Sequence, residues 1–185
     1  MAERGTTQGH ETLNEPISTA EVRLALAEPR PKLRLQIWPP AIVPSMLPTS
    51  IGATREEDPL RVLCLGPTEW LIVATSQRPA SSHHLAASLA AAAPGRDYAL
   101  VDVSAGLQTL ELRGPTTRHL LAKGCGLDLH PRRFPAGRCT QTKFAGLPVI
   151  IDCPDDSGRF DLYVSRSYVS WITSWLEAAL ALDCP

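Results

Sequence analysis

The sequence contains no uninterrupted apolar run near the roughly 20 residues that a membrane-spanning helix needs. It begins Met-Ala-Glu-Arg-Gly-Thr-Thr-Gln, without the basic-then-apolar pattern of a secretory signal. We therefore expect a cytoplasmic protein that does not bind membranes. With 185 residues, of which 44% are hydrophobic, the chain is long enough to bury a core in one domain or in two small halves.

The chain also lacks paired cysteines. Its five cysteines are widely spaced and include no Cys-x-x-Cys motif, which argues against a disulfide framework or a structural zinc site. Cys64 and Cys153 lie in apolar runs and are expected in the core, whereas Cys125 and Cys139 flank a basic segment and are expected to be more exposed. A metal site could be built from Cys125, His130 and Cys139, but the sequence offers no fourth ligand for it. A reactive thiol at Cys125 or Cys139 stays an alternative.

No dinucleotide-binding fingerprint of the Gly-x-Gly-x-x-Gly type follows a predicted strand, so the sequence offers no physical basis for holding FAD or NAD. Asp102 and Ser104 lie near a predicted strand end, where a carboxylate can act as a base, but no nucleophile pattern accompanies them. We predict instead that Asp102 forms a turn with Ser104. The sequence thus predicts no catalytic residue, no metal and no cofactor bound by this chain.

The most informative stretch runs from Leu110 to Arg138. Between Arg113 and Lys143 there are seven Lys and Arg residues against one acid, Asp128, which leaves 11 basic and 18 acidic residues elsewhere. This local excess suits nucleic acid, an anionic small ligand or an acidic partner surface, although a net charge of −1 argues against coating of nucleic acid. A solvated face with local salt bridges is the alternative.

Candidate binding residues follow from this charge and from the last predicted helix. Pro131 and Pro135 restrict the backbone of the basic loop. Arg and Trp side chains are typical of protein interfaces. We assign partner or anion binding to His130, Arg132, Arg133, Arg138, Trp171 and Trp175.

Residues 1–30 are polar and end in Pro29-Arg-Pro31, which predicts a flexible N-terminal arm before a single domain of residues 31–185. Within the arm, Ser18 followed by Glu21 has the spacing of a capping box and predicts a helix over 18–26. Five prolines in residues 39–59 predict a long extended connection.

Alternating apolar and polar residues predict the strands. We expect a strand over 32–38, hairpins over 60–74 and 137–152, a strand pair over 99–113, and a strand over 160–164. Helices are predicted over 82–93, after Gly114-Pro115, and over 167–182. Strands interleaved with helices through tight turns predict an α+β fold of two ferredoxin-like halves, with helices packed on antiparallel or mixed sheets.

Six motifs then resemble, in order, the gamma subunit of heterotetrameric sarcosine oxidase, over about residues 33–180. They are Leu65-Gly-Pro-Thr-Glu-Trp-Leu71, Val101-Asp-Val-Ser-Ala-Gly106, Leu112-Arg-Gly-Pro115, Leu121-Ala-Lys-Gly-Cys-Gly-Leu-Asp-Leu-His-Pro131, Phe134-Pro-Ala-Gly-Arg-Cys-Thr-Gln141 and Ser165-Arg-Ser-Tyr168. This resemblance implies a fold similar to the folate-binding domain of the glycine-cleavage aminomethyltransferases.

The resemblance also implies a complex with alpha, beta and delta subunits that demethylates sarcosine to glycine and passes the one-carbon unit to tetrahydrofolate. FAD, covalently held FMN, NAD and tetrahydrofolate are then expected on the other subunits, and this chain is expected to be a non-catalytic docking subunit. A folate-binding module that uses Arg132, Arg133 or Arg138 for the polyglutamate tail is one alternative, and a cysteine-dependent enzyme is another. The related N-methylglutamate dehydrogenases have a similar small subunit, so the amine substrate does not follow from this chain.

Overall fold

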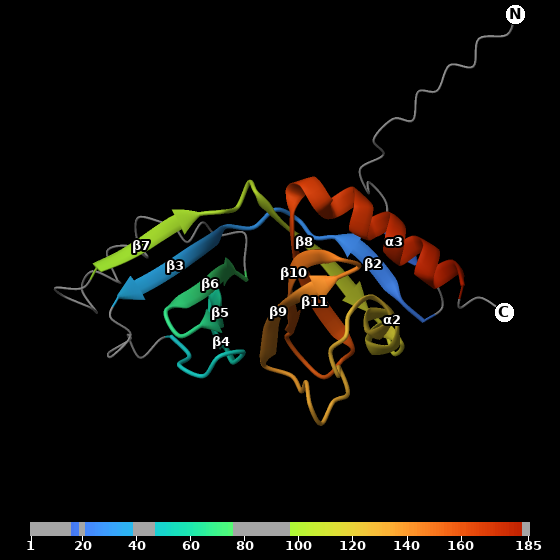
Figure 1. The fold of residues 1–185 in the computed structure, drawn as a ribbon, viewed down its shortest axis with the longest axis horizontal. Coiled ribbons are helices and arrows are strands. Elements are labelled where there is room, and N and C mark those ends of the chain that lie inside the picture. Colours follow the sequence, from blue (N-terminus) through green and yellow to red (C-terminus); the bar gives the residue numbers. More distant parts are fainter. Residues whose placement is uncertain (1–15, 19–20, 39–46, 76–96, 183–185) are drawn as a thin grey trace, which may run out of the picture.

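The computed structural model describes residues 16–18, 21–38, 47–75 and 97–182, which form two antiparallel sheets and two α-helices (Figure 1). The strands are β1 (Ile17–Ser18), β2 (Arg23–Leu26), β3 (Lys32–Trp38), β4 (Thr54–Glu57), β5 (Leu60–Gly66), β6 (Glu69–Ala74), β7 (Asp97–Asp102), β8 (Leu107–Arg113), β9 (Arg138–Phe144), β10 (Leu147–Cys153) and β11 (Arg159–Ser165). The helices are α2 (Thr117–Gly124) and α3 (Val169–Ala181), the latter preceded by a short 3-10 turn, η1 (Arg166–Tyr168).

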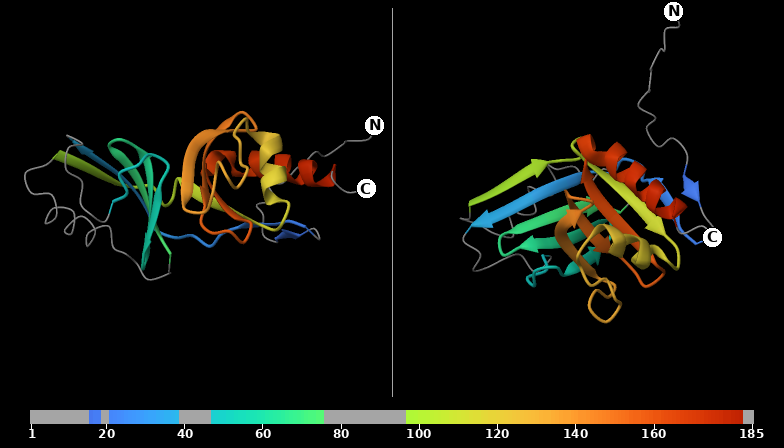
Figure 2. Two further views of the ribbon diagram at one scale, coloured as in Figure 1. Left: turned by 90° about the horizontal axis from the view of Figure 1, so that it is seen from below. Right: turned by 45° about the vertical axis from the view of Figure 1, so that its right-hand side comes forward.

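Each sheet belongs to one half of the molecule. Sheet A has the strand order β1-β2-β8-β11-β10-β9, and sheet B has the order β4-β5-β6-β3-β7. Helices α2 and α3 cover the face of sheet A that points away from sheet B (Figure 2). The predicted α+β class, with helices packed on antiparallel sheets, is confirmed.

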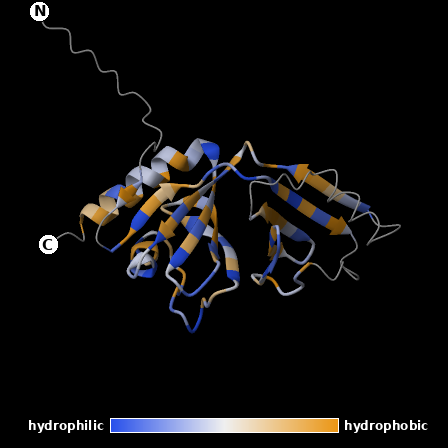
Figure 3. Cartoon of the chain, turned by 180° about the vertical axis from the view of Figure 1, so that it is seen from behind, coloured by the Kyte–Doolittle hydropathy of each residue, from blue (hydrophilic) through white to orange (hydrophobic). Residues whose placement is uncertain are grey.

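Strand β11 shows how sheet A is buried on both faces. Phe160, Leu162 and Val164 pack against the helices, while the alternate residues Asp161 and Tyr163 face sheet B. All five are buried, and each fully buried apolar side chain contributes about 1.5–3 kcal/mol. Figure 3 shows the corresponding bands of hydrophobic and hydrophilic residues along the strands.

Helix α2 begins just after Gly114-Pro115, as predicted, and Thr117 Oγ1 donates a hydrogen bond of 2.9 Å to Gly114 O. Gly124 is the last residue of this helix, and a glycine at the end of a helix commonly takes the left-handed conformation. It does not take the left-handed conformation; instead, a Cβ there would lie 2.4 Å from Cε2 of Phe144. Close packing against an aromatic ring therefore requires glycine.

The helix predicted over 18–26 is wrong, because these residues contain β1 and β2. Leu24 and Leu26 pair with Leu112 and Leu110 of β8, and both Val22 and Leu24 are buried. The gain from sheet pairing and apolar burial overrides the local capping signal. The described part of the predicted arm is thus built into sheet A.

The structure also differs from two further predictions, one about strand pairing and one about the connection over 39–59. The strands β7 and β8 exist, but they do not pair with each other: β7 pairs with β3 in sheet B, and β8 pairs with β2 and β11 in sheet A. The predicted connection over 39–59 contains strand β4. The helix predicted over 82–93 lies outside the described residues. Among the described residues, no helix is long and apolar enough to cross a membrane.

Candidate functional site: the basic loop and the junction of the sheets

The basic loop between α2 and β9 is held in place by Arg118. Nη1 of Arg118 donates hydrogen bonds to Leu129 O at 2.6 Å and to Phe134 O at 2.8 Å. Its guanidinium carbon lies 4.9 Å from the centroid of the Phe160 ring, at cation–π distance. Arg118 therefore stabilises the loop from inside and is not free for a ligand.

Local turns then fix the cationic part of the loop. Asp128 Oδ1 accepts a hydrogen bond of 3.0 Å from His130 N, and His130 O accepts from the backbone N–H groups of Arg133 and Phe134 at 2.8 Å each. Phe134 is buried and anchors the turn. The side chains of His130, Arg132 and Arg133 consequently lie exposed on an ordered backbone.

Two of the predicted arginines meet at one groove. Arg133 and Arg138 line a groove of about 360 Å³ between the basic loop and the strands where the two sheets join. We call it the arginine groove; its lining also includes Ile51, Gly52, Leu127, Asp128, Thr140 and Gln141. Among the described residues, no carboxylate forms an ion pair with Arg132, Arg133 or Arg138. The unbalanced charge of this groove makes it the strongest candidate for binding an anionic group.

The two predicted tryptophans lie on α3 and do not line this groove. Trp171 is 59% exposed. Trp175 is half-buried, with its ring edge-on to Phe144 at a centroid distance of 5.0 Å. Of these two tryptophans, Trp171 alone protrudes from the surface, whereas Trp175 is part of the packing between α3 and β9.

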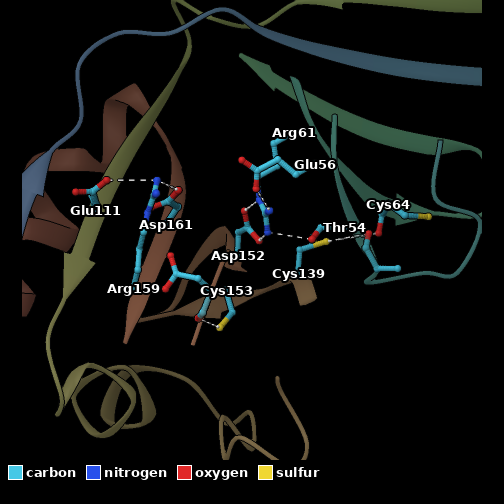
Figure 4. Close-up of polar contacts among 12 residues, drawn as sticks. Thr54, Glu56, Arg61, Cys64, Glu111, Cys139, Asp152, Cys153, Arg159 and Asp161 are labelled. Carbon is cyan, nitrogen blue, oxygen red and sulfur yellow. Dashed lines mark hydrogen bonds and ion pairs between the residues drawn. The ribbon is translucent and has the colours of Figure 1, made fainter. Parts of the chain in front are cut away.

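A buried ion pair at the junction of the sheets was not predicted from the sequence. Arg61 of β5 donates to Asp152 of β10 through Nε at 2.6 Å and through Nη2 at 2.8 Å (Figure 4). Burial lowers the pKa of Arg61, but the hydrogen bonds and charge of Asp152 more than reverse this and raise it. Burial raises the pKa of Asp152, and the pairing with Arg61 opposes that rise. The one local signal was a charged residue inside the apolar run of β5.

A second carboxylate lies directly beside the first. Asp161 is opposite Asp152 in the register of β10 and β11, and it accepts hydrogen bonds from Arg159 Nε at 3.0 Å and Nη2 at 2.7 Å. Arg159 Nη2 also lies 3.4 Å from Glu111 Oε2. Each buried carboxylate thus has its own arginine, so these acids link strands and are not available to a substrate.

The burial of the cysteines differs in part from the prediction. Cys64 and Cys153 are buried as expected, but Cys139 is buried too, because its side chain alternates inward on β9. Burial, with the nearby charge of Asp152, raises the pKa of Cys139 to about 12, which excludes it as a lowered-pKa nucleophile. Cys125 is half-buried, and no group of three or more metal-ligating side chains occurs among the described residues.

Asp102 forms the predicted turn, since its Oδ1 accepts a hydrogen bond of 2.9 Å from Ser104 N. This hydrogen bonding lowers the pKa of Asp102. The turn borders a second cleft of about 340 Å³ between the sheets, lined mainly by apolar residues including Leu71, Val103 and Ile150. Arg34 at this cleft is already paired with Glu69. The arginine that lines the second cleft is therefore already neutralised, whereas the two that line the arginine groove have no carboxylate partner among the described residues.

Residues 47–182 match the model of the sarcosine oxidase gamma subunit family. The chain belongs to this family. All six predicted binding residues, the arginine groove and the Arg61–Asp152 pair fall within the part of the chain that matches the gamma-subunit family.

Individual sarcosine oxidase gamma subunits are also similar to the chain. The gamma subunit of Arthrobacter sp is 39% identical over 106 residues, which cover 57% of this chain and 50% of the relative. That of Corynebacterium sp. strain P-1 is 36% identical over 136 residues, which cover 73% and 64% respectively. The chain thus spans about half to two thirds of the length of these relatives.

Solved structures agree with this family fold. A chain of heterotetrameric sarcosine oxidase from Corynebacterium sp. U-96, in complex with pyrrole 2-carboxylate, superposes with a TM-score of 0.75 at 25% identity, covering 92% of this chain and 89% of that one. Aminomethyltransferase T of the glycine cleavage system from Bartonella henselae gives 0.59 at 15% identity, covering 85% and 45%. The second likeness concerns the fold alone, and it confirms the expected aminomethyltransferase-like fold.

Proposed function

We propose that this chain is the small, non-catalytic gamma subunit of a heterotetrameric sarcosine oxidase and acts in assembly and stabilisation of the complex. The complex demethylates sarcosine to glycine and passes the one-carbon unit to tetrahydrofolate. Alpha, beta and delta subunits are its partners in the cytoplasm, and FAD, FMN, NAD and tetrahydrofolate lie on those subunits. The names of the relatives and the match to a chain of a heterotetramer support this proposal.

The distribution of charge is the observation that carries the non-catalytic role. Asp152 and Asp161 are buried and paired with Arg61 and Arg159, while Cys139 is buried with a raised pKa. Arg132, Arg133 and Arg138, which have no carboxylate partner among the described residues, lie instead on the exposed loop and its groove. Asp152, Asp161 and Cys139 are therefore neutralised inside, whereas the three arginines are displayed outside.

Co-expression tests this role. The alpha, beta and delta subunits are produced with and without this chain, and complex yield, flavin content and sarcosine oxidation are measured. We expect the isolated chain to be colourless and inactive, and we expect its omission to lower the yield of intact complex. An alpha–beta–delta assembly of full yield and full activity without this chain would overturn the proposal.

A folate-binding module is the second candidate, favoured by the two arginines that flank the arginine groove. Guanidinium groups pair well with the carboxylates of a polyglutamate tail. Calorimetric titration of the purified chain with tetrahydrofolate polyglutamate tests it, and absence of heat at millimolar ligand would exclude it. If the chain serves the equivalent complex of a related N-methyl amino acid dehydrogenase, the assembled complex will instead oxidise that amine in preference to sarcosine.

A further inference from the structure

We propose that the arginine groove binds an acidic segment of a partner polypeptide, whose carboxylates pair with Arg133 and Arg138. This inference rests on the proposed role in assembly and adds the chemistry of the partner surface to it. Four observations carry it: the unpaired charge, the fixed backbone of both arginines, the uncharged floor of the groove, and an exposed apolar residue at its edge.

Within the residues that the structure describes, Arg133 and Arg138 lack the carboxylate partner that several other arginines of this chain have. Arg34, Arg61, Arg113 and Arg159 each form an ion pair with a carboxylate of this chain. In the described part of the chain, Arg133 and Arg138 have no such pair, and Arg132 on the same loop has none either. The one acid that lines the groove, Asp128, uses Oδ1 to accept from His130 N.

Both arginines are attached to fixed backbone. Arg133 lies in the loop that Arg118 clamps through two carbonyl oxygens, and Arg138 opens strand β9. The Arg138 guanidinium lies close over Gly52, because a Cβ at Gly52 would come within 3.1 Å of Arg138 Nη2. A binding site whose cationic groups are already positioned loses less conformational entropy when its partner arrives.

The floor of the groove is uncharged. Cys64 and Cys139 lie there, both buried, and burial raises the pKa of each thiol, so neither is a thiolate at neutral pH. Leu65 and Phe134 complete the apolar lining. An ion pair formed over an apolar floor is less screened by water than one on an open surface.

An exposed apolar residue at the groove favours a polypeptide over a free inorganic anion. Ile51, which comes directly after residues 47–50 in the chain, lines the groove. Its side chain is 56% exposed. A segment that carries an apolar side chain next to carboxylates fits both features at once, whereas phosphate would use only the arginines. Opposite charges across an interface chiefly improve specificity and the rate of association.

The test uses charge reversal in the complete chain. Arg133→Glu with Arg138→Glu is compared with Arg23→Glu with Arg166→Glu, a matched control that reverses two exposed arginines on β2 and η1. Affinity for the alpha–beta–delta assembly is measured by biolayer interferometry at low and high salt. We expect the groove variant to lose about 10- to 100-fold in affinity and most of the salt dependence, and the control to stay within about threefold.

Each result of this experiment either supports or overturns the proposed docking of an acidic segment. If the wild-type chain assembles and both variants bind equally well, the arginine groove is not the docking site, although the assembly role stands. If the wild-type chain does not assemble, both proposals fail. If the groove variant assembles normally but loses binding of tetrahydrofolate polyglutamate, the groove is a small-ligand site and the inference is overturned. Arg133→Gln with Arg138→Gln, and thermal unfolding of all variants, separate lost binding from lost folding.

Discussion

Gly52 shows how one residue can connect two sheets. Its N–H donates to Cys64 O at 2.9 Å in sheet B, and its carbonyl accepts from Cys139 N at 2.8 Å in sheet A. The φ of Gly52 is 78°, in the left-handed region, and a Cβ would lie 2.9 Å from Cys139 O. Both the conformation and the space at this position therefore require glycine.

We predict that Gly52→Ala lowers the free energy of unfolding by about 2–4 kcal/mol, because it combines a left-handed non-glycine residue with a steric clash. Gly126→Ala is the matched control, since a Cβ at Gly126 would meet no atom within 4 Å and its φ is not positive. The control should change stability by less than about 0.5 kcal/mol. Urea denaturation of both variants measures the difference, and equal midpoints would contradict the prediction.

The contribution of Glu111 to stability depends on pH. It accepts a hydrogen bond of 2.7 Å from Arg113 Nε, which lowers its pKa; burial opposes this, and the charge of Arg159 adds to it. A carboxyl with a lowered folded-state pKa stabilises the fold above the ordinary value of 4.5, and this contribution is lost as pH falls through the folded-state pKa.

Glu111→Gln should therefore cost about 0.5–1 kcal/mol at pH 7, the range of a partly exposed pair. The difference from wild type should shrink to near zero once the pH is below the folded-state pKa of Glu111. Denaturant unfolding at a series of pH values tests this. A deficit that stays constant from neutral to acidic pH would show that lost packing, and not lost charge, explains the effect.

At the scale of the element, helix α3 carries one packed Trp and one exposed Trp within about a single turn. Trp175 packs edge-on against Phe144, while Trp171, four residues earlier, is 59% exposed. We predict that Trp175→Ala lowers the free energy of unfolding by about 2 kcal/mol, less than for a fully buried Trp. Trp171→Ala should change stability by less than about 0.5 kcal/mol but weaken binding to the partner subunits.

Thermal unfolding and binding to the alpha–beta–delta assembly, measured on the same two samples, test this pair. Each variant is the control of the other, because both remove a Trp from one helix. Equal destabilisation by the two variants would contradict the packing argument. Unchanged binding of Trp171→Ala would remove that residue from the interface.

Strands and the partners within two hairpins were predictable from the sequence, but pairings between strands far apart in the chain were not. Alternation located β3, β8 and the hairpin of β9 and β10 closely, since it depends only on which face of a strand is buried. Pairing depends on residues far apart in the chain, so two neighbouring strands, β7 and β8, fall in different sheets. Local signals also misled at residues 18–26, where pairing with β8 overrides a capping pattern.

The candidate site shows the same division. The basic loop was visible as a concentration of charge, but the wall of the groove that Gly52 and Arg138 form comes from the contact between the sheets. The pair Arg61 and Asp152 is separated by 91 positions in the sequence. No local pattern indicates that these two charges neutralise each other in the core.

At the scale of the whole molecule, several kinds of contact between described residues join the two sheets. An apolar cluster includes Leu63, Leu71, Ile150 and Tyr163; backbone hydrogen bonds run through residues 52–54; and Arg61 pairs with Asp152. Because each sheet uses the other to cover one of its faces, the described parts of both halves are expected to unfold together.

Substitutions in the Arg61–Asp152 ion pair test this joint unfolding. Arg61→Met leaves a fully buried carboxylate without its arginine, and we predict a loss of about 3–5 kcal/mol. Asp152→Leu should cost less, because Arg61 keeps Thr54 at 2.9 Å and Glu56 at 3.3 Å. The double variant, which replaces both charges with apolar side chains, should be more stable than Arg61→Met alone.

Denaturant unfolding followed by tryptophan fluorescence and by far-ultraviolet circular dichroism measures these differences. Fluorescence follows the tryptophans of both halves, Trp38 and Trp70 in sheet B and Trp171 and Trp175 on α3, and circular dichroism follows the secondary structure, so one shared midpoint indicates a single unfolding unit. If the two single losses simply add in the double variant, the charges do not interact across the junction. If fluorescence and circular dichroism instead give separate midpoints for Arg61→Met, the ion pair is what makes the two sheets unfold together. This follows because the apolar cluster and the backbone hydrogen bonds between the sheets remain in that variant.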